Sequence, residues 1–142
     1  MIYEAAGGLT GSAKYKPGGT GWENPTLDAV VGHTPYSDYF ELGGGATAKI
    51  IFRKAGFWRL TAQYNIIGAD CVSCRILNGT TEECFGASPN DSTSRNNTAR
   101  CSYIVYLNDG DERIFQRANQ VAGVYFHLSA AFSHVEIEYL GV

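Results

Sequence analysis

The most constraining feature of this sequence is the alternation of apolar and polar side chains between residues 57 and 66. In Phe57-Trp58-Arg59-Leu60-Thr61-Ala62-Gln63-Tyr64-Asn65-Ile66, every even position is apolar and the odd positions are mostly polar. Successive side chains of a β-strand point to opposite faces of a sheet. The period of two therefore predicts a strand with one buried face and one face in solvent.

The same alternation recurs in shorter segments between residues 32 and 142. Further strands are predicted at 48–53, 101–107, 124–128 and 135–139, with weaker ones at 39–42, 72–78 and 112–117. No segment repeats apolar residues at helical spacing over three turns with capping residues. We therefore expect an all-β domain, and the regular spacing of about eight short strands favours a sandwich or barrel.

Two short polar links join predicted strands. Lys54-Ala55-Gly56 separates one pair, and Asn108-Asp109-Gly110-Asp111 separates another. An Asp-Gly dipeptide supplies the positive φ that a tight hairpin needs, so both links are predicted to be hairpins. Residues 88–98 are too polar to pack and are predicted to be a surface loop.

The composition bounds the number of domains and the class of partner. A chain of 142 residues has room for one domain and a modest arm. Its net charge of −3 provides no broad basic field for a nucleic-acid backbone. No run approaches the roughly 18 apolar residues of a membrane span, and the N-terminus lacks the pattern of a signal peptide. Neither nucleic acid nor a membrane is an expected partner.

Residues 1–31 differ from the rest of the chain. Glycine and proline punctuate this polar segment, and no period is sustained. We expect an extended N-terminal arm over residues 1–31, followed by the β-domain over residues 32–142. The arm's anchors are spaced like side chains of an extended peptide on another surface, and they are Tyr3, Leu9, Tyr15 and Trp22.

The chain has four cysteines: Cys71, Cys74, Cys84 and Cys101. Structural zinc sites usually pair two short Cys-x-x-Cys knuckles, and only Cys71-x-x-Cys74 is one. A redox Cys-x-x-Cys normally accompanies a βαβ unit, which the sequence lacks. Buried thiols or structural disulfides remain. Four cysteines allow three pairings, and at least one disulfide is expected outside the cell. Cys84 with Cys101 is a possible pair, since it would close the polar loop between them and contribute about 3 kcal/mol.

The sequence contains no recognisable catalytic constellation. It lacks a Gly-x-Ser-x-Gly elbow and the Gly-Lys-Ser/Thr of a phosphate loop. A calcium loop at Asp109, Asp111 and Glu112 is an alternative to the turn, but the turn explains these residues more simply. No catalytic residue, metal or cofactor is predicted, and the protein is not expected to be an enzyme.

Aromatic residues are too many for one core. Rings fall on opposite faces of their predicted strands at Tyr103, Tyr106, Tyr125, Phe126, Phe132 and Tyr139. A single buried face cannot accommodate them all, and aromatic side chains are enriched at subunit interfaces. We therefore expect a closed homo-oligomer.

Three segments, in order, resemble the complement C1q and tumour necrosis factor superfamily. They are the strand pair Phe52-Arg53-Lys54-Ala55-Gly56-Phe57-Trp58-Arg59-Leu60-Thr61, the turn Tyr106-Leu107-Asn108-Asp109-Gly110-Asp111-Glu112, and the closing strand Phe132-Ser133-His134-Val135-Glu136-Ile137-Glu138-Tyr139-Leu140-Gly141. The resemblance covers roughly residues 36–142. It implies a jelly-roll β-sandwich that assembles as a homotrimer around an aromatic-rich axis. By the same resemblance, the residues predicted at the trimer interface are Tyr64, Tyr103, Phe126 and Tyr139.

Two departures from that superfamily shape the expected function. No collagen-like Gly-X-Y stalk precedes the domain, and the domain is shorter than most animal members. Compact versions of the fold are found in phage and viral fibres, spikes and capsid decorations, which a small chain with an extended arm resembles better. The expected function is a trimeric virion component attached to a capsid or tail protein through its arm. The alternative is a secreted, extracellular C1q-like recognition domain that binds glycans or proteins.

Overall fold

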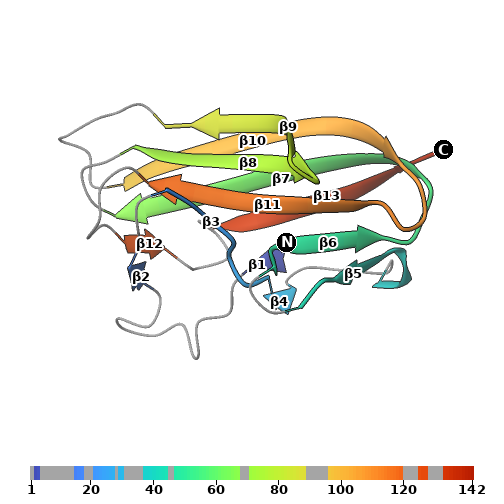
Figure 1. The fold of residues 1–142 in the computed structure, drawn as a ribbon, viewed down its shortest axis with the longest axis horizontal. Coiled ribbons are helices and arrows are strands. Elements are labelled where there is room, and N and C mark those ends of the chain that lie inside the picture. Colours follow the sequence, from blue (N-terminus) through green and yellow to red (C-terminus); the bar gives the residue numbers. More distant parts are fainter. Residues whose placement is uncertain are drawn as a thin grey trace.

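The computed structural model of the chain is a sandwich of two antiparallel β-sheets (Figure 1). It describes residues 2–3, 15–17, 21–27, 29–30, 37–44, 47–67, 71–88, 96–119, 125–127 and 133–142. Apart from short 3-10 turns, among them η2 (Ser37–Tyr39), all regular structure in these ranges is β-strand. The expectation of an all-β jelly-roll sandwich is confirmed. No helix in the described part of the chain has the length and hydropathy needed to span a bilayer.

Sheet A is built around one long strand, β7 (Gly56–Ile67). Along its whole length β7 pairs with β10 (Asn96–Leu107) on one side. On its other side it pairs with β13 (His134–Gly141) and β12 (Tyr125–His127). Three short strands complete the sheet: β1 (Ile2–Tyr3), β2 (Tyr15–Pro17) and β4 (Ala29–Val30).

Sheet B contains five strands in the order β5-β6-β11-β8-β9. Their bounds are β5 (Phe40–Leu42), β6 (Lys49–Phe52), β11 (Glu112–Asn119), β8 (Val72–Asn78) and β9 (Thr81–Ala87). A further strand, β3 (Gly21–Glu23), lies against β11 (Figure 1).

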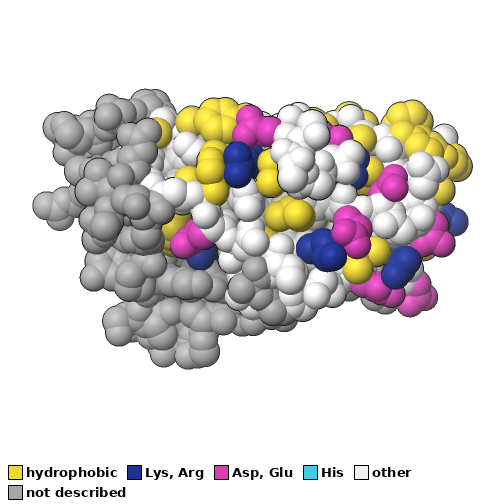
Figure 2. Space-filling model, in the orientation of Figure 1, with side chains coloured by type: hydrophobic (Ala, Val, Ile, Leu, Met, Phe, Trp, Pro, Cys, Tyr) yellow, Lys and Arg dark blue, Asp and Glu magenta, His cyan; other side chains and the backbone are white. Residues whose placement is uncertain are grey.

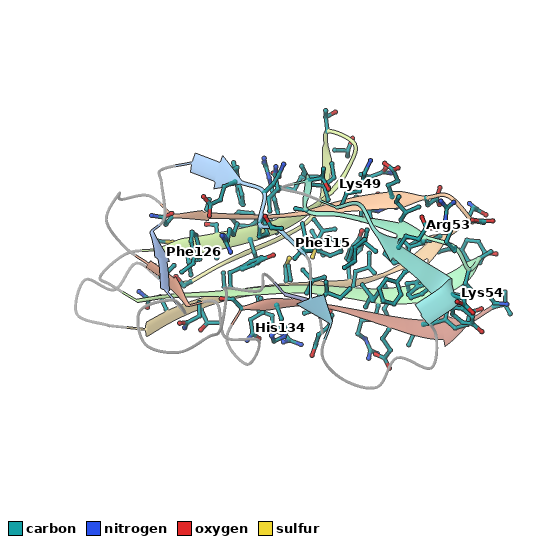
Figure 3. All side chains as sticks on the ribbon, turned by 90° about the horizontal axis from the view of Figure 1, so that it is seen from below. Lys49, Arg53, Lys54, Phe115, Phe126 and His134 are labelled. Atoms are coloured by element: carbon teal, nitrogen blue, oxygen red, sulfur yellow. The ribbon has the colours of Figure 1, made fainter. Side chains whose placement is uncertain are left out.

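The core lies between the two sheets and follows the alternation of β7. The even positions of β7, which the sequence pattern placed inside, are at most 2% exposed: Trp58, Leu60, Ala62, Tyr64 and Ile66. Phe115 of β11 lies between the two layers (Figure 3). The indole of Trp58 packs edge to face on Phe52, with ring centroids 5.0 Å apart, and its N–H donates to the carbonyl of Lys54.

The two predicted hairpins are not hairpins. Residues 53–55 lead from β6 in sheet B to β7 in sheet A, and residues 108–111 lead from β10 in sheet A to β11 in sheet B. The links lie together, because Phe52 N–H donates to Asp111 O and Gly110 N–H donates to Phe52 O, each across 2.8 Å. A short polar link can close a hairpin within one sheet or carry the chain from one sheet to the other. Both of these links carry the chain to the other sheet.

A true hairpin joins β8 to β9. Asn78 stands opposite Thr81, and Gly79 between them adopts a positive φ of 61°, as a tight two-residue turn requires. The sequence pattern missed β9 because most of its side chains are exposed and so show no clear alternation of apolar and polar residues.

The described parts of residues 1–31 are built into the sandwich. Ile2 of β1 stands between Val135 of β13 and Val30 of β4, and its side chain is buried. Leu27 is also part of the core. These contacts make Ile2 and Leu27 part of the core of the sandwich. The division into an arm over residues 1–31 and a domain over residues 32–142 stays a prediction.

Candidate functional site

An apolar band occupies one end of the outer face of sheet A. We use this name for Phe57 on β7, Ile104 and Tyr106 on β10, and Leu140 on β13, whose exposed fractions are 46%, 56%, 46% and 41%. Tyr106 stands directly opposite Phe57, and their rings meet edge to face with centroids 5.2 Å apart. Figure 2 shows hydrophobic side chains gathered at the end of the molecule where the C-terminus lies. Such a group of large apolar side chains in solvent marks an interaction surface.

Charged and polar side chains cover the middle of the same face. Arg59 donates to Glu138 across 2.6 Å, and Arg100 donates to Gln63 across 2.9 Å. Next to them the hydroxyls of Thr61 and Ser102 are 2.7 Å apart. The outer face of sheet A therefore has an apolar end beside a polar, hydrogen-bonded centre, as an interface core and its rim do.

Two residues predicted at the trimer interface, Tyr64 and Phe126, lie inside the chain's own core. Their side chains are 2% and 0% exposed. The guanidinium of Arg117 lies over both rings, 4.3 Å from the centroid of Phe126 and 5.6 Å from that of Tyr64. The assignment of these two residues to an interface is therefore corrected: buried rings leave no surface for a second subunit to contact.

The other two predicted interface residues are partly buried and held by their own chain. The hydroxyl of Tyr139 donates to the carbonyl of Ala55 across 3.1 Å, and its ring packs edge to face on Trp58. The hydroxyl of Tyr103 donates to Glu83 across 2.6 Å. Their role at an interface stays a prediction.

A charged network joins Glu83 of β9, Tyr103 of β10 and Arg113 of β11. The buried guanidinium of Arg113 donates to Glu83 across 2.8 Å. Partial burial alone would raise the pKa of Glu83, but the hydrogen bonds from Tyr103 and Arg113 and the charge of Arg113 lower it. Burial and the bond to Glu83 raise the pKa of Tyr103. At neutral pH the pair is a carboxylate and a neutral phenol, which is a structural arrangement rather than a proton relay.

Sequence reasoning missed the buried cation Arg117. Its side chain is 1% exposed, and its Nε donates to Glu23 of β3 across 2.7 Å. The signal was present, because Arg117 shares its strand face with the core residue Phe115 two positions earlier. An alternation rule that counts only apolar residues does not place an arginine in a core.

The four cysteines are free thiols. The predicted disulfide between Cys84 and Cys101 is not formed in this structure and stays a prediction. The sulfur atoms of Cys74 and Cys101 are 3.6 Å apart. Cys71 makes a separate interaction, donating to the carbonyl of Ser88 across 3.0 Å.

The predicted anchors of the N-terminal segment lie at different places. The backbone of Tyr3 pairs with Ala29, and that of Tyr15 pairs with His127. Leu9 lies outside the described residues. Trp22 is exposed over sheet B, where the guanidinium of Arg75 lies 4.0 Å from its ring centroid and Phe85 meets it edge to face.

A cavity opens beside Trp22. Its volume is about 330 Å³, and no charged side chain is among its described lining residues, which are Gly21, Trp22, Ser73, Ala118 and Asn119. This volume is at the lower end of the range for small-molecule sites. Among these residues, the indole of Trp22 forms an aromatic wall, and the polar side chains are the hydroxyl of Ser73 and the carboxamide of Asn119.

The three carboxylates of the alternative calcium loop contact other groups of the chain. Asp111 accepts the backbone N–H of Asn108 across 2.8 Å. Asp109 lies 3.5 Å from Arg53, and Glu112 pairs with Lys49 at 3.3 Å. Within the described ranges, no group of three or more His, Cys, Asp or Glu side chains is placed to hold a metal ion.

Solved structures share this architecture at low sequence identity. Murine APRIL at pH 5.0 matches with a TM-score of 0.64 and 11% identity, covering 98% of this chain and 95% of its own. Eiger TNF from S. frugiperda matches with a TM-score of 0.51 and 14% identity, covering 66% of this chain and 64% of its own. No protein-family model and no curated protein sequence matches the chain. The chain therefore has the jelly-roll fold of tumour necrosis factor-like proteins.

Proposed function

We propose that this protein is a non-enzymatic homotrimer that acts through its surfaces. The observation that carries the proposal is the apolar band, four large side chains left in solvent on a rigid sheet. Burying apolar surface stabilises an assembly by roughly 25 cal/mol per Å². The resemblance to the C1q and tumour necrosis factor superfamily implies a threefold assembly, and the band supplies a contact surface for it.

The band replaces the buried tyrosine and phenylalanine as the proposed centre of the interface. Phe57 and Tyr106 form a preformed aromatic pair, so little side-chain freedom is lost when a second copy packs on them. The ion pair between Arg59 and Glu138 borders the band. It remains hydrated in this arrangement, which avoids the cost of burying two charges.

Within this class, the role we propose is that of a virion structural protein, either a capsid decoration or a fibre or spike component. Support comes from the compact TNF-like fold and from the N-terminal segment. Strands β2 and β4 stand at the ends of the strand order of sheet A. Outermost strands present backbone groups that a strand of another protein can pair with, which provides a route for attachment to a capsid or tail protein.

The oligomeric state tests the assembly. Light scattering after size-exclusion chromatography should give three times the chain mass of 15.4 kDa. Phe57→Ser should shift the protein to monomer without unfolding it. The matched control is Phe85→Ser, since Phe85 is similarly exposed but lies on sheet B. A wild-type monomer at micromolar concentration would contradict the proposal.

Mass spectrometry of purified virus particles tests the virion role separately. The protein should be present as a fixed component that salt washing does not remove. Its absence from the particles would end the virion role and leave the trimer intact.

One observation favours the secreted recognition domain as a second candidate. The cavity beside Trp22 combines an indole wall with Ser73 and Asn119, which suits a neutral ligand with one apolar face and several hydroxyls, such as a sugar ring. Binding of neutral monosaccharides followed by NMR, and its loss in Trp22→Ala, would support that candidate. Asn78, Asn90 and Asn96 each begin an Asn-x-Ser/Thr sequon, and glycans on any of them would also support that candidate.

A further inference from the structure

Three of the four thiols meet where the edges of the two sheets come together. Cys74 of β8 and Cys84 of β9 belong to sheet B, and Cys101 of β10 belongs to sheet A. The sulfur atoms of Cys74 and Cys101 are 3.6 Å apart. Cys84 is also close enough to Cys101 for this neighbour to contribute to the raised pKa of the Cys84 thiol. Cys101 therefore stands between two possible disulfide partners.

The backbones of β9 and β10 also touch beside the thiols. A Cβ atom added to Gly86 would clash with the carbonyl oxygen of Arg100. A disulfide needs its sulfur atoms about 2.05 Å apart and its Cα atoms within about 7 Å. The sulfur atoms of Cys74 and Cys101 need to approach by only about 1.5 Å to reach that bond length. The close packing of β9 on β10 keeps Cys84 near Cys101.

The three thiols differ in their access to solvent. Cys74 and Cys101 are buried, whereas Cys84 is only half-buried. A soluble reagent therefore reaches Cys84 first. Burial, followed by the neighbouring Cys101, raises the pKa of the Cys84 thiol to about 12. Because the thiolate is the attacking form, reaction at neutral pH is slow but directed to one sulfur.

We propose that this cluster is a thiol–disulfide exchange site for low-molecular-weight disulfides, with Cys84 as the entry residue and Cys101 as the resolving residue. The Cys84 thiolate attacks one sulfur of oxidised glutathione, whose S–S bond breaks. A mixed disulfide forms at Cys84, and one glutathione thiolate leaves and takes up the proton that Cys84 released.

The Cys101 thiolate then attacks the Cys84 sulfur and expels the second glutathione. The new bond links sheet A to sheet B, two protein thiols have been oxidised, and one glutathione disulfide has been reduced to two thiols. Cys74 can attack Cys101 in a further exchange, which moves the bond to Cys74–Cys101 and returns Cys84 as a thiol. This site does not depend on the proposed virion function.

Peptide mapping tests the site on the full-length folded protein. After incubation with oxidised glutathione and alkylation, trypsin separates the thiols into three peptides. Peptide 60–75 carries Cys71 and Cys74, peptide 76–95 carries Cys84, and peptide 101–113 carries Cys101. The expected product links peptide 101–113 to peptide 76–95 or to peptide 60–75. Four alkylated thiols, or a lasting glutathione adduct on Cys84 of the wild-type protein, would overturn the proposal.

Serine variants identify the order of events. Cys84→Ser should slow formation of the link at Cys101 at least tenfold, since the entry residue is gone. Cys101→Ser should accumulate glutathione on Cys84 without any internal disulfide. Cys71→Ser, the matched control outside the cluster, should behave as wild type. Oxidation of Cys84→Ser at the wild-type rate would refute the entry role, even if the variant at the buried Cys101 fails to fold.

Discussion

Glu23 of β3 accepts a hydrogen bond from Nε of Arg117 across 2.7 Å, and this contact ties the N-terminal segment to a cation inside the core. Arg117 is almost fully buried, so its charge depends on partners supplied by the protein. The guanidinium also lies over the ring of Phe126 of sheet A. One buried side chain thus connects β3, sheet B and sheet A.

Neutralising Glu23 should therefore destabilise the fold. We expect Glu23→Gln to cost about 2–3 kcal/mol of unfolding free energy, because a buried guanidinium loses its charged partner. Urea denaturation followed by tryptophan fluorescence measures the change. The control is Glu138→Gln, whose exposed pair with Arg59 should contribute less than about 1 kcal/mol. Equal effects in the two variants would contradict the role given to Arg117.

The first strand should be as important to stability as a core strand. Ile2→Ala removes a fully buried side chain between β13 and β4, with an expected cost of about 2–4 kcal/mol. Val142→Ala, at an almost fully exposed position, should change stability by less than about 0.5 kcal/mol. Thermal and urea unfolding of both variants would show whether the N-terminal segment is part of the sandwich or an attached arm.

The network around Glu83 predicts a loss of stability in acid. The pKa of Glu83 in the folded protein lies below the ordinary value of 4.5, so the unfolded chain binds the proton more readily. This contribution is complete above pH 4.5 and is lost as the pH falls through the lower folded pKa. Urea midpoints measured from pH 7 to pH 3 should fall more steeply for wild type than for Glu83→Gln. Parallel curves would refute the assignment.

Substitution of Gly86 should separate the two sheet edges. A methyl group at this position meets the backbone of Arg100, so Gly86→Ala must push β9 away from β10. We expect faster labelling of Cys84 and Cys101 by a thiol reagent. Ala87→Ser, a conservative change at an exposed position of the same strand, is the control. It should leave the labelling rates of these two thiols unchanged.

The sequence predicted those parts of the fold in which one face of a strand is apolar. Trp58 and Leu60 are buried as their alternation required, and the flanking strand β10 was found for the same reason. The sequence could not predict whether a short link returns to the same sheet or crosses to the other one. The residues Asn108-Asp109-Gly110-Asp111 suit both connections. The crossing is recognisable only once Gly110 is seen bonded to Phe52 of β6.

The sequence predicted that exposed aromatic side chains form an interface, but it did not identify the residues at the centre of the candidate interface. An excess of rings over core positions is visible in the sequence, yet the choice among rings depends on which strands face one another. Tyr64 lies under Arg117, whereas Phe57 on the opposite face of the same strand stays in solvent. Because successive side chains of a strand alternate between faces, the sequence separates Tyr64 from Phe57. Only the packing of sheet B on sheet A shows which of the two faces is buried.

The pairing of Ile2 with Val135 has a consequence for synthesis of the protein. Residues 2–3 find their neighbours on β13 only after more than 130 further residues have been synthesised. Contacts between such distant parts of a chain slow folding. We therefore expect the native structure to form only once β13 has left the ribosome, and a ribosome stalled before β13 to carry a chain that proteases digest.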